Sequence, residues 1–339
     1  MSEEDFFRSE PTPYASWRWA VLMGANSRTY KFPLGDALLE HAATGREDLP
    51  LRELAVTYAM AIARRVNDAP QASQSTSTGA ADFLTVAREE AEESLTAGEP
   101  TERLVRAAMA SMPAMVMQKF HNIRGGEVPH RFYEIHGRGP DRVVSLSREL
   151  RRIAESSQLF TLRGELDARW SIVETSFMTG VGSNLIDQGL SVDVQYEVLT
   201  DKHRRRSVTG VREALIGFRH GRCLICDELI GPEDRVAIDH TFPFALMDRF
   251  GIHRSWPELD LDAIWNLAPA HYDCNAGKND RPPSVAQLER LVQRNEAIMY
   301  SPHPLSRTLR VTLDNGTRSF AGGRAWADFV LAVQAFFFS

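Results

Sequence analysis

The three cysteines of this 339-residue chain are the residues whose spacing most directly predicts chemistry. All three fall between positions 223 and 274, and Cys223 and Cys226 form a C-x-x-C pair. Scattered thiols would behave as small buried hydrophobes, and an odd number of cysteines makes no disulfide framework. Clustered thiols instead indicate metal ligation, because a C-x-x-C turn lets two thiolates bind one zinc ion.

A second half-site completes the predicted zinc site. The stretch HYDC places His271 three residues before Cys274, which repeats the C-x-x-C spacing with a histidine in place of one cysteine. Structural zinc is bound by four ligands in tetrahedral geometry, so Cys223, Cys226, His271 and Cys274 make a complete Cys3His set. A lone C-x-x-C pair also suits a redox motif, but no thioredoxin-like strand and helix pattern surrounds this one.

Polar residues that zinc does not need lie between and just after the two half-sites. The stretch RVAIDH alternates like a strand and ends in Asp239 and His240. Asn266 precedes the second half-site, Asn275 follows it directly, and Lys278 lies about one helical turn further on. Each has an ordinary interpretation alone, as a surface pair or, for an asparagine, as a helix cap. Their order around one zinc site is what indicates a function.

This order of residues resembles the HNH endonuclease (ββα-metal) family in its zinc-stabilised form. The resemblance rests on IDHTFPF, then WNLAPAHYDCN, then a lysine, and covers about residues 219–281. Two positions depart from the family pattern. His271 stands where the third zinc cysteine is usual, which zinc tolerates. Asn275 stands where the last histidine of the family name is usual, and there an amide oxygen takes the ligand role.

The resemblance implies a role for each polar residue. His240 would be the general base that takes a proton from the attacking water, since a neutral imidazole suits that task. Asp239 and Asn275 would hold one catalytic cation, Mg²⁺ or Mn²⁺, because such ions prefer hard oxygen ligands. The Asn266 amide would pin the loop and help orient the base. Lys278 would contact a backbone phosphate of the nucleic acid.

Charge is distributed unevenly along the chain. The formal net charge of -6 argues against a nucleic-acid partner, because phosphate binders usually carry a positive field. Residues 201–222 have the opposite balance, with seven basic and two acidic residues. A solvated helix face is the ordinary interpretation of such a run. Because this basic run lies beside the predicted nuclease, it favours contacts with the DNA backbone. The basic residues expected to make them are Arg204, Arg205, Arg206, Arg219 and Arg222.

Periodicity predicts the elements that position these residues. Apolar residues at helical spacing predict helices within 14–66 and over 82–94 and 100–118. Strands are expected in HRFYEIHG and RVVSLS, followed by helices at 147–156 and 166–177. After the motif we expect a helix over 284–299, a hairpin over 307–320 that turns at Asp314-Asn315-Gly316, and a last helix from Arg324.

These elements predict an α+β fold, with a helix-rich N-terminal region before a C-terminal ββα-metal nuclease domain. The chain length and its ordinary globular composition predict more than one core. We expect five segments, which are a helical 1–66, a flexible connector 67–81, a mixed targeting or regulatory region 82–200, the nuclease 201–300, and a hairpin and helix 301–339 that pack on it.

The leading functional hypothesis is a metal-dependent DNA endonuclease with structural zinc and catalytic Mg²⁺ or Mn²⁺. The resemblance suggests bacterial restriction or antiphage defence, with a homodimer or a defence-system partner protein. Two alternatives stay open: a zinc-stabilised module that binds nucleic acid or protein without cutting, and a nuclease for RNA. RNA ranks lower because no aromatic and basic stacking platform is evident. No apolar run could cross a bilayer and no signal peptide is evident, so a cytoplasmic location is expected.

Overall fold

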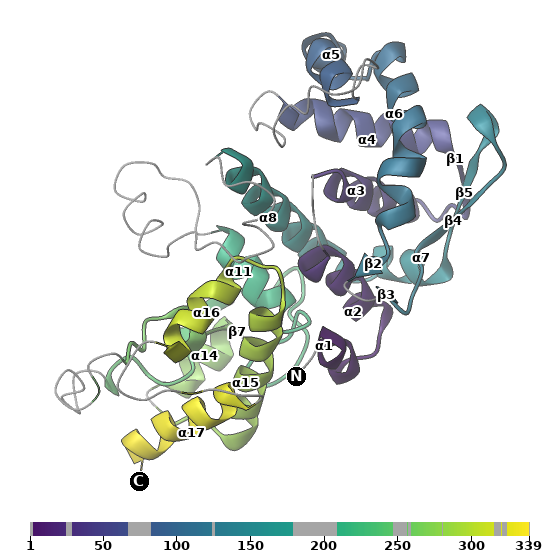
Figure 1. Cartoon of the computed structure of the whole chain (residues 1–339). Helices are drawn as coiled ribbons and strands as arrows, with labels where there is room; N and C mark the ends of the chain where they lie inside the picture. Colours follow the sequence, from purple (N-terminus) through teal and green to yellow (C-terminus); the bar gives the residue numbers. More distant parts are fainter. Residues whose placement is uncertain are drawn as a thin grey trace. The chain divides into compact units, whose positions relative to one another are not determined.

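The computed structural model describes residues 3–24, 29–66, 83–123, 126–178, 209–246, 256, 259–279, 281–314, 320 and 324–338. These residues form helices and small antiparallel sheets, in agreement with the predicted α+β class (Figure 1). The chain divides into two compact units, Thr12–Asp187 and a second made of Met1–Pro11 with Gln188–Ser339. The predicted connector 67–81 lies outside the described residues, and the five predicted segment boundaries stay predictions.

The unit Thr12–Asp187 is mostly helical. Its α-helices are α2 (Pro13–Arg18), α3 (Lys31–Ala42), α4 (Leu51–Val66), α5 (Phe83–Ala97), α6 (Glu102–Met115), α7 (Arg148–Ala154) and α8 (Leu159–Met178). They confirm the predicted helices of this region. A three-stranded antiparallel sheet places β5 (Val143–Leu146) between β1 (Asp48–Pro50) and β4 (Tyr133–His136). Strands β4 and β5 are the two that the alternating patterns predicted, and β2 (Asn122–Ile123) pairs with β3 (Gly126–Glu127).

The core of this unit follows from the helical spacing of its apolar residues. Leu34 and Leu38 of α3, and Leu54 and Tyr58 of α4, are fully buried. One ion pair lies within this core, where the Arg18 guanidinium donates to the Glu165 carboxylate at 2.9 Å, with both side chains almost fully buried. A buried pair of this kind fixes geometry more than it adds stability, because both charges lose their hydration.

The second unit contains the predicted metal and nuclease residues. Its elements are α1 (Glu3–Ser9), α11 (Thr209–Gly217), β6 (Val236–His240), the short 3₁₀ helix η4 (Ile264–Asn266), β7 (Leu267–His271), α14 (Tyr272–Lys278), α15 (Val285–Tyr300), α16 (Leu305–Asp314) and α17 (Ala325–Phe338). The helix expected over 284–299 is confirmed as α15. Ser284 caps it, with Gln287 completing a capping box.

The hairpin expected over 307–320 is wrong. Residues Leu305–Asp314 form helix α16, and Asn315 and Gly316 lie outside the described residues. Leu305, Leu309 and Leu313 recur every fourth residue and are all buried. This helical period outweighs the local turn signal, because burial of one apolar stripe against the unit stabilises the helix.

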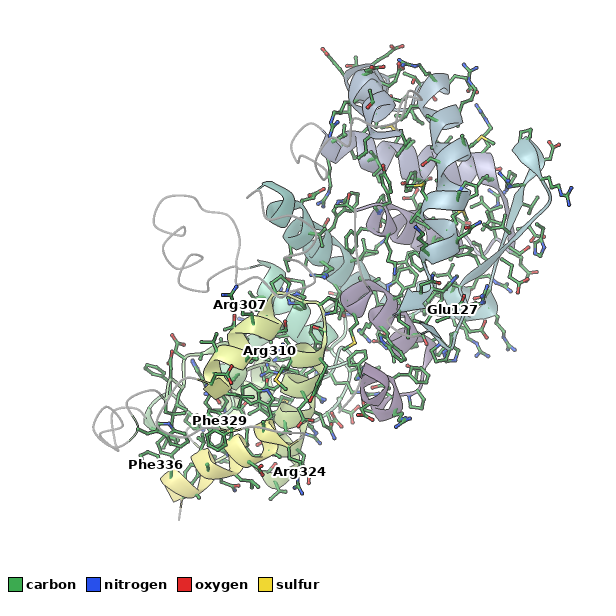
Figure 2. All side chains as sticks on the ribbon, in the orientation of Figure 1. Glu127, Arg307, Arg310, Arg324, Phe329 and Phe336 are labelled. Atoms are coloured by element: carbon green, nitrogen blue, oxygen red, sulfur yellow. The ribbon has the colours of Figure 1, made fainter. Side chains whose placement is uncertain are left out.

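Aromatic packing joins the last helix to the strand pair. Phe329 of α17, labelled with Phe336 in Figure 2, contacts Trp265 edge to face at 4.9 Å between ring centroids. It also contacts Trp256 at 6.0 Å and Trp326 at 5.4 Å. Since Trp265 precedes Asn266, this cluster supports the loop that leads into β7.

Among the described residues, no helix is both long and apolar enough to cross a membrane.

Candidate metal centre and active site

The first predicted zinc half-site lies on a tight turn. Asp227 donates from its backbone N–H to the Cys223 carbonyl at 3.0 Å, and Cys223 donates to the Glu228 carbonyl at 2.9 Å. Arg222 and Leu229 pair across the turn in an isolated antiparallel bridge. Asp227 has a φ of 67°, the left-handed conformation that closes such a turn and that aspartate tolerates better than most residues. The turn directs Cys223 and Cys226 toward one point.

The second half-site lies where β7 ends and α14 begins. Strands β6 and β7 pair antiparallel, with Val236 opposite His271, and Cys274 lies in the first turn of α14. The Leu224 N–H donates to the Pro269 carbonyl at 2.8 Å and joins the first half-site to β7. The strand pair and the turn therefore bring together residues separated by about fifty positions in the sequence.

The four predicted zinc ligands meet in a single group. Their ligand atoms all lie within 4.8 Å of one another. The Nδ1 atom of His271 is 3.4 Å from the Cys226 sulfur and 3.8 Å from the Cys274 sulfur. A zinc tetrahedron with bonds of about 2.3 Å to sulfur and about 2.0 Å to nitrogen separates these atoms by about 3.5 Å. Donor type and spacing both fit a structural zinc ion.

The thiols of this group influence one another. Burial, together with the neighbouring Cys226 and Cys223 sulfurs, raises the pKa of the Cys274 thiol to about 12. Burial also opposes ionisation of Cys223, but hydrogen bonds from the backbone at Cys226 and His271 outweigh it and lower its pKa. Neighbouring thiolates repel each other, and a shared cation relieves that repulsion.

The His271 ring is oriented by groups outside the ligand set. Its Nε2 atom lies 3.3 Å from both the Leu229 carbonyl oxygen and an Asp234 carboxylate oxygen. An N–H at Nε2 donates to these acceptors, which leaves the Nδ1 lone pair directed at the sulfurs. Such outer contacts are usual for histidines that bind metals.

Asp239 and Asn275 come together at the other end of the strand pair. The Asn275 amide lies 3.0 Å from both carboxylate oxygens of Asp239. With its nitrogen inward, the amide donates to both oxygens, and with its oxygen inward it adds a third hard donor. Oxygen donors of this kind suit Mg²⁺ or Mn²⁺. The structure therefore brings together the two residues that were expected to hold the catalytic cation.

Lys278 contacts the same carboxylate from the last turn of α14. Its ammonium group lies 2.5 Å from an Asp239 carboxylate oxygen, and it also donates to the His240 carbonyl. The Lys278 side chain is only 8% exposed. In this arrangement the ammonium balances the charge of Asp239 instead of facing solvent, where a nucleic-acid phosphate would be contacted.

His240 is held by an acidic residue that the sequence did not single out. Its Nε2 atom lies 2.8 Å from a carboxylate oxygen of Asp262. The ring also contacts Phe244, whose side chain is exposed. An Nε2–H that donates to Asp262 leaves the Nδ1 lone pair able to accept a proton, which is the arrangement a general base needs.

Asn266 ties together the two chain segments that flank this pair. It is fully buried, and its side-chain oxygen accepts from the Phe242 N–H at 2.8 Å. Its amide nitrogen donates to the carbonyls of Phe242 at 2.9 Å and Leu261 at 2.8 Å. Because Phe242 lies two residues after His240 and Leu261 precedes Asp262, Asn266 positions both partners of the hydrogen bond.

The basic residues expected at DNA do not form one exposed surface in the described part of the chain. Arg219 is almost fully buried and pairs with Asp227 at 2.5 Å. Arg222 forms a bidentate pair with Glu10, which follows α1. Arg204, Arg205 and Arg206 lie outside the described residues. With Lys278, three of the six expected contacts thus serve ion pairs within this unit.

Comparison with other proteins returns no relatives. No protein-family model, no curated protein and no solved structure matches this chain.

Proposed function

We propose that the chain is a metal-dependent DNA endonuclease whose active site lies at the end of β6. The observation that carries the proposal is the joint geometry of two pairs on one small unit. Asp239 meets the Asn275 amide at 3.0 Å, while His240 meets Asp262 at 2.8 Å. A strand pair with a short helix, held by a Cys3His group, brings them together.

The chain's own residues supply the proton-handling parts of the reaction. Asp262 accepts the Nε2–H of His240, so Nδ1 takes a proton from the water that attacks the phosphorus. Asn266 fixes the backbone on both sides of this pair. A divalent cation held by Asp239 and Asn275 would stabilise negative charge on the phosphate and on the departing 3′ oxygen. Lys278 keeps the Asp239 carboxylate oriented through its ion pair.

A nicking assay on supercoiled plasmid tests the proposal. Full-length protein with Mg²⁺ or Mn²⁺ is expected to convert plasmid to open circles, and His240→Ala is expected to stop this while the protein keeps its zinc. Intact plasmid with the wild-type protein on every DNA form would favour a binding module without cleavage. Cleavage of structured RNA but not of plasmid would favour an RNA substrate.

Two features support hydrolysis over a purely structural zinc module. A zinc module needs only the four ligands, and Cys223, Cys226, His271 and Cys274 already complete the tetrahedron. The Asp239, Asn275, His240 and Asp262 groups lie outside that ligand set and have no part in closing it. We also propose restriction or antiphage defence as the biological setting of this nuclease.

A further inference from the structure

A second polar site lies in the same unit, between α1, the end of α11 and α15. A pocket of about 450 Å³ opens there, a volume that accommodates a small organic ligand. Arg8, Arg219 and Arg294 line it, together with His220 and Gln293. Asp5 is the only carboxylate among the described residues that line it, and it lies 3.4 Å from Arg8. The lining is therefore predominantly cationic.

Arg294 places a fully buried positive charge at this pocket. Its Nη2 atom donates to the Trp265 carbonyl at 2.8 Å and to the Ile264 carbonyl at 3.3 Å. Within the described part of the chain, no carboxylate lies within ion-pair distance of it. Burial, with the nearby charge of Arg219, lowers the pKa of the guanidinium to about 9. The charge is held by these carbonyl dipoles and by the Asn295 side-chain oxygen, to which Nε donates at 3.1 Å, with no anionic partner among the described residues.

Arg219 leaves part of its hydrogen-bonding capacity unused. Its Nη2 atom donates to Asp227 at 2.5 Å, but its Nε–H is buried and has no hydrogen-bond acceptor among the described residues. Leaving a charged donor buried without an acceptor costs free energy. An oxyanion that accepts from the guanidinium of Arg219 would satisfy this donor, because the planar fork matches the oxygens of phosphate. The Arg294 guanidinium is already hydrogen-bonded to protein oxygens and contributes its positive charge.

The pocket also has an apolar wall. Phe6 of α1 and Phe218 both line it, and both are buried. The Phe6 ring stacks on His220 with 4.1 Å between centroids. A ligand that fills the pocket therefore needs an apolar or aromatic part beside its anionic group.

We propose that this pocket binds a small phosphate monoester, with its phosphate at Arg219, beside the positive charge of Arg294, and its apolar part against Phe6 and Phe218. The binding site is separate from the candidate active site and does not depend on the nuclease proposal. Arg294 also holds the carbonyls next to Asn266, and Arg219 holds Asp227 of the first zinc half-site. A bound ligand would thus contact residues that support both clusters of the unit.

Calorimetric titration of the full-length protein with phenyl phosphate, without added Mg²⁺, tests this inference. Phenyl phosphate is expected to bind at least five times more tightly than inorganic phosphate, and phenol is expected not to bind. Gln293 is exposed, and its side chain lines the pocket without a described hydrogen bond. Gln293→Glu adds a negative charge without disturbing either arginine and is expected to weaken binding at least tenfold.

Two matched variants make the outcome decisive. Gln334→Glu makes the same chemical change on α17, away from the pocket lining, and is expected to bind as the wild type does. His240→Ala is also expected to bind normally, so loss of nicking and loss of phosphate binding are separate results. The inference is overturned if phenyl phosphate gives no binding heat, if Gln293→Glu binds as tightly as the wild type, or if His240→Ala abolishes binding.

Discussion

The β6–β7 strand pair carries a different polar cluster toward each end. Near Val236 and His271, four sulfur and nitrogen donors lie within 4.8 Å of one another and could complete a zinc tetrahedron. Toward His240, Asp239 and Asn275 supply hard oxygens, and an acid–imidazole pair stands beside them. A closed ligand shell holds a fold together, whereas a shell with few protein ligands leaves positions for substrate and water. Under the proposed function, the first cluster stabilises the fold and the second carries out the chemistry.

Removing a zinc ligand should have the largest effect, because both clusters depend on the folded unit. Cys223→Ser is expected to lose zinc, to unfold the second unit and to abolish nicking. Zinc binding contributes about 10–16 kcal/mol in small zinc-folded peptides, more than the whole stability of many domains. Zinc content by mass spectrometry and thermal melting measure this. A Cys223→Ser protein that melts like the wild type would show that the four-ligand assignment is wrong.

Removing the predicted base should separate chemistry from folding. His240→Ala is expected to slow plasmid nicking by about 10²- to 10⁴-fold, the usual contribution of a general base. Zinc content and melting temperature should stay at the wild-type values, because His240 touches none of the four ligands. A variant that nicks as fast as the wild type would remove His240 from the mechanism.

Asn266 supports both the folded unit and the His240–Asp262 pair. Its substitution should therefore lower both stability and nicking. Asn266→Ala leaves the buried Phe242 N–H and the Leu261 carbonyl without their side-chain partner. Each unsatisfied buried group costs about 1–3 kcal/mol, so the melting temperature should fall. Nicking at a temperature where the variant is folded should fall as well, since His240 and Asp262 lose their common support. Chemical denaturation and nicking of the same preparation measure the two effects, and unchanged nicking in the folded variant would contradict the positioning role.

Asp262 should give the smallest effect of the four. Asp262→Asn keeps a hydrogen-bond acceptor near Nε2 of His240 but removes the negative charge. Exposed ionic contacts of this kind contribute about 0.2–1 kcal/mol, which corresponds to a factor of up to about five. We expect nicking to slow by about that factor with no change in zinc content, because Asp262 is mostly exposed and is not one of the four zinc ligands. Equal rates for variant and wild type would mean that the pair is a surface contact.

Residue types and spacing identified the zinc ligands, because metal ligation imposes short, fixed intervals on the chain. The C-x-x-C pair and the H-x-x-C pair are each local, so both can be recognised without knowledge of the fold. Most helices and the strands β4, β5 and β6 were predicted for a similar reason, since burial of one face leaves a period in the sequence. The hairpin expected at Asp314 is wrong because the buried leucine period of α16 outweighs the local turn signal.

The ion pairs of the arginines and of Lys278 could not be predicted from local sequence patterns. A run of basic residues indicates positive charge but not the partner of each side chain. Arg219 pairs with Asp227, and Arg222 pairs with Glu10 from the N-terminal segment, more than 200 positions away. Asp262 meets His240 where Asn266 ties the two loops together, and no spacing rule predicts that contact.

The amino-acid sequence predicted the Cys3His group, the order of the polar residues around it and the α+β class, because each follows from short-range spacing and periodicity. The tertiary structure decided the pairing of Asp239 with Asn275 and of His240 with Asp262, the burial of Arg219 and Arg294, and the pocket that α1 helps to form. These depend on contacts between segments distant in the chain, and long-range contacts are set by packing of the whole unit and not by any local run of residues.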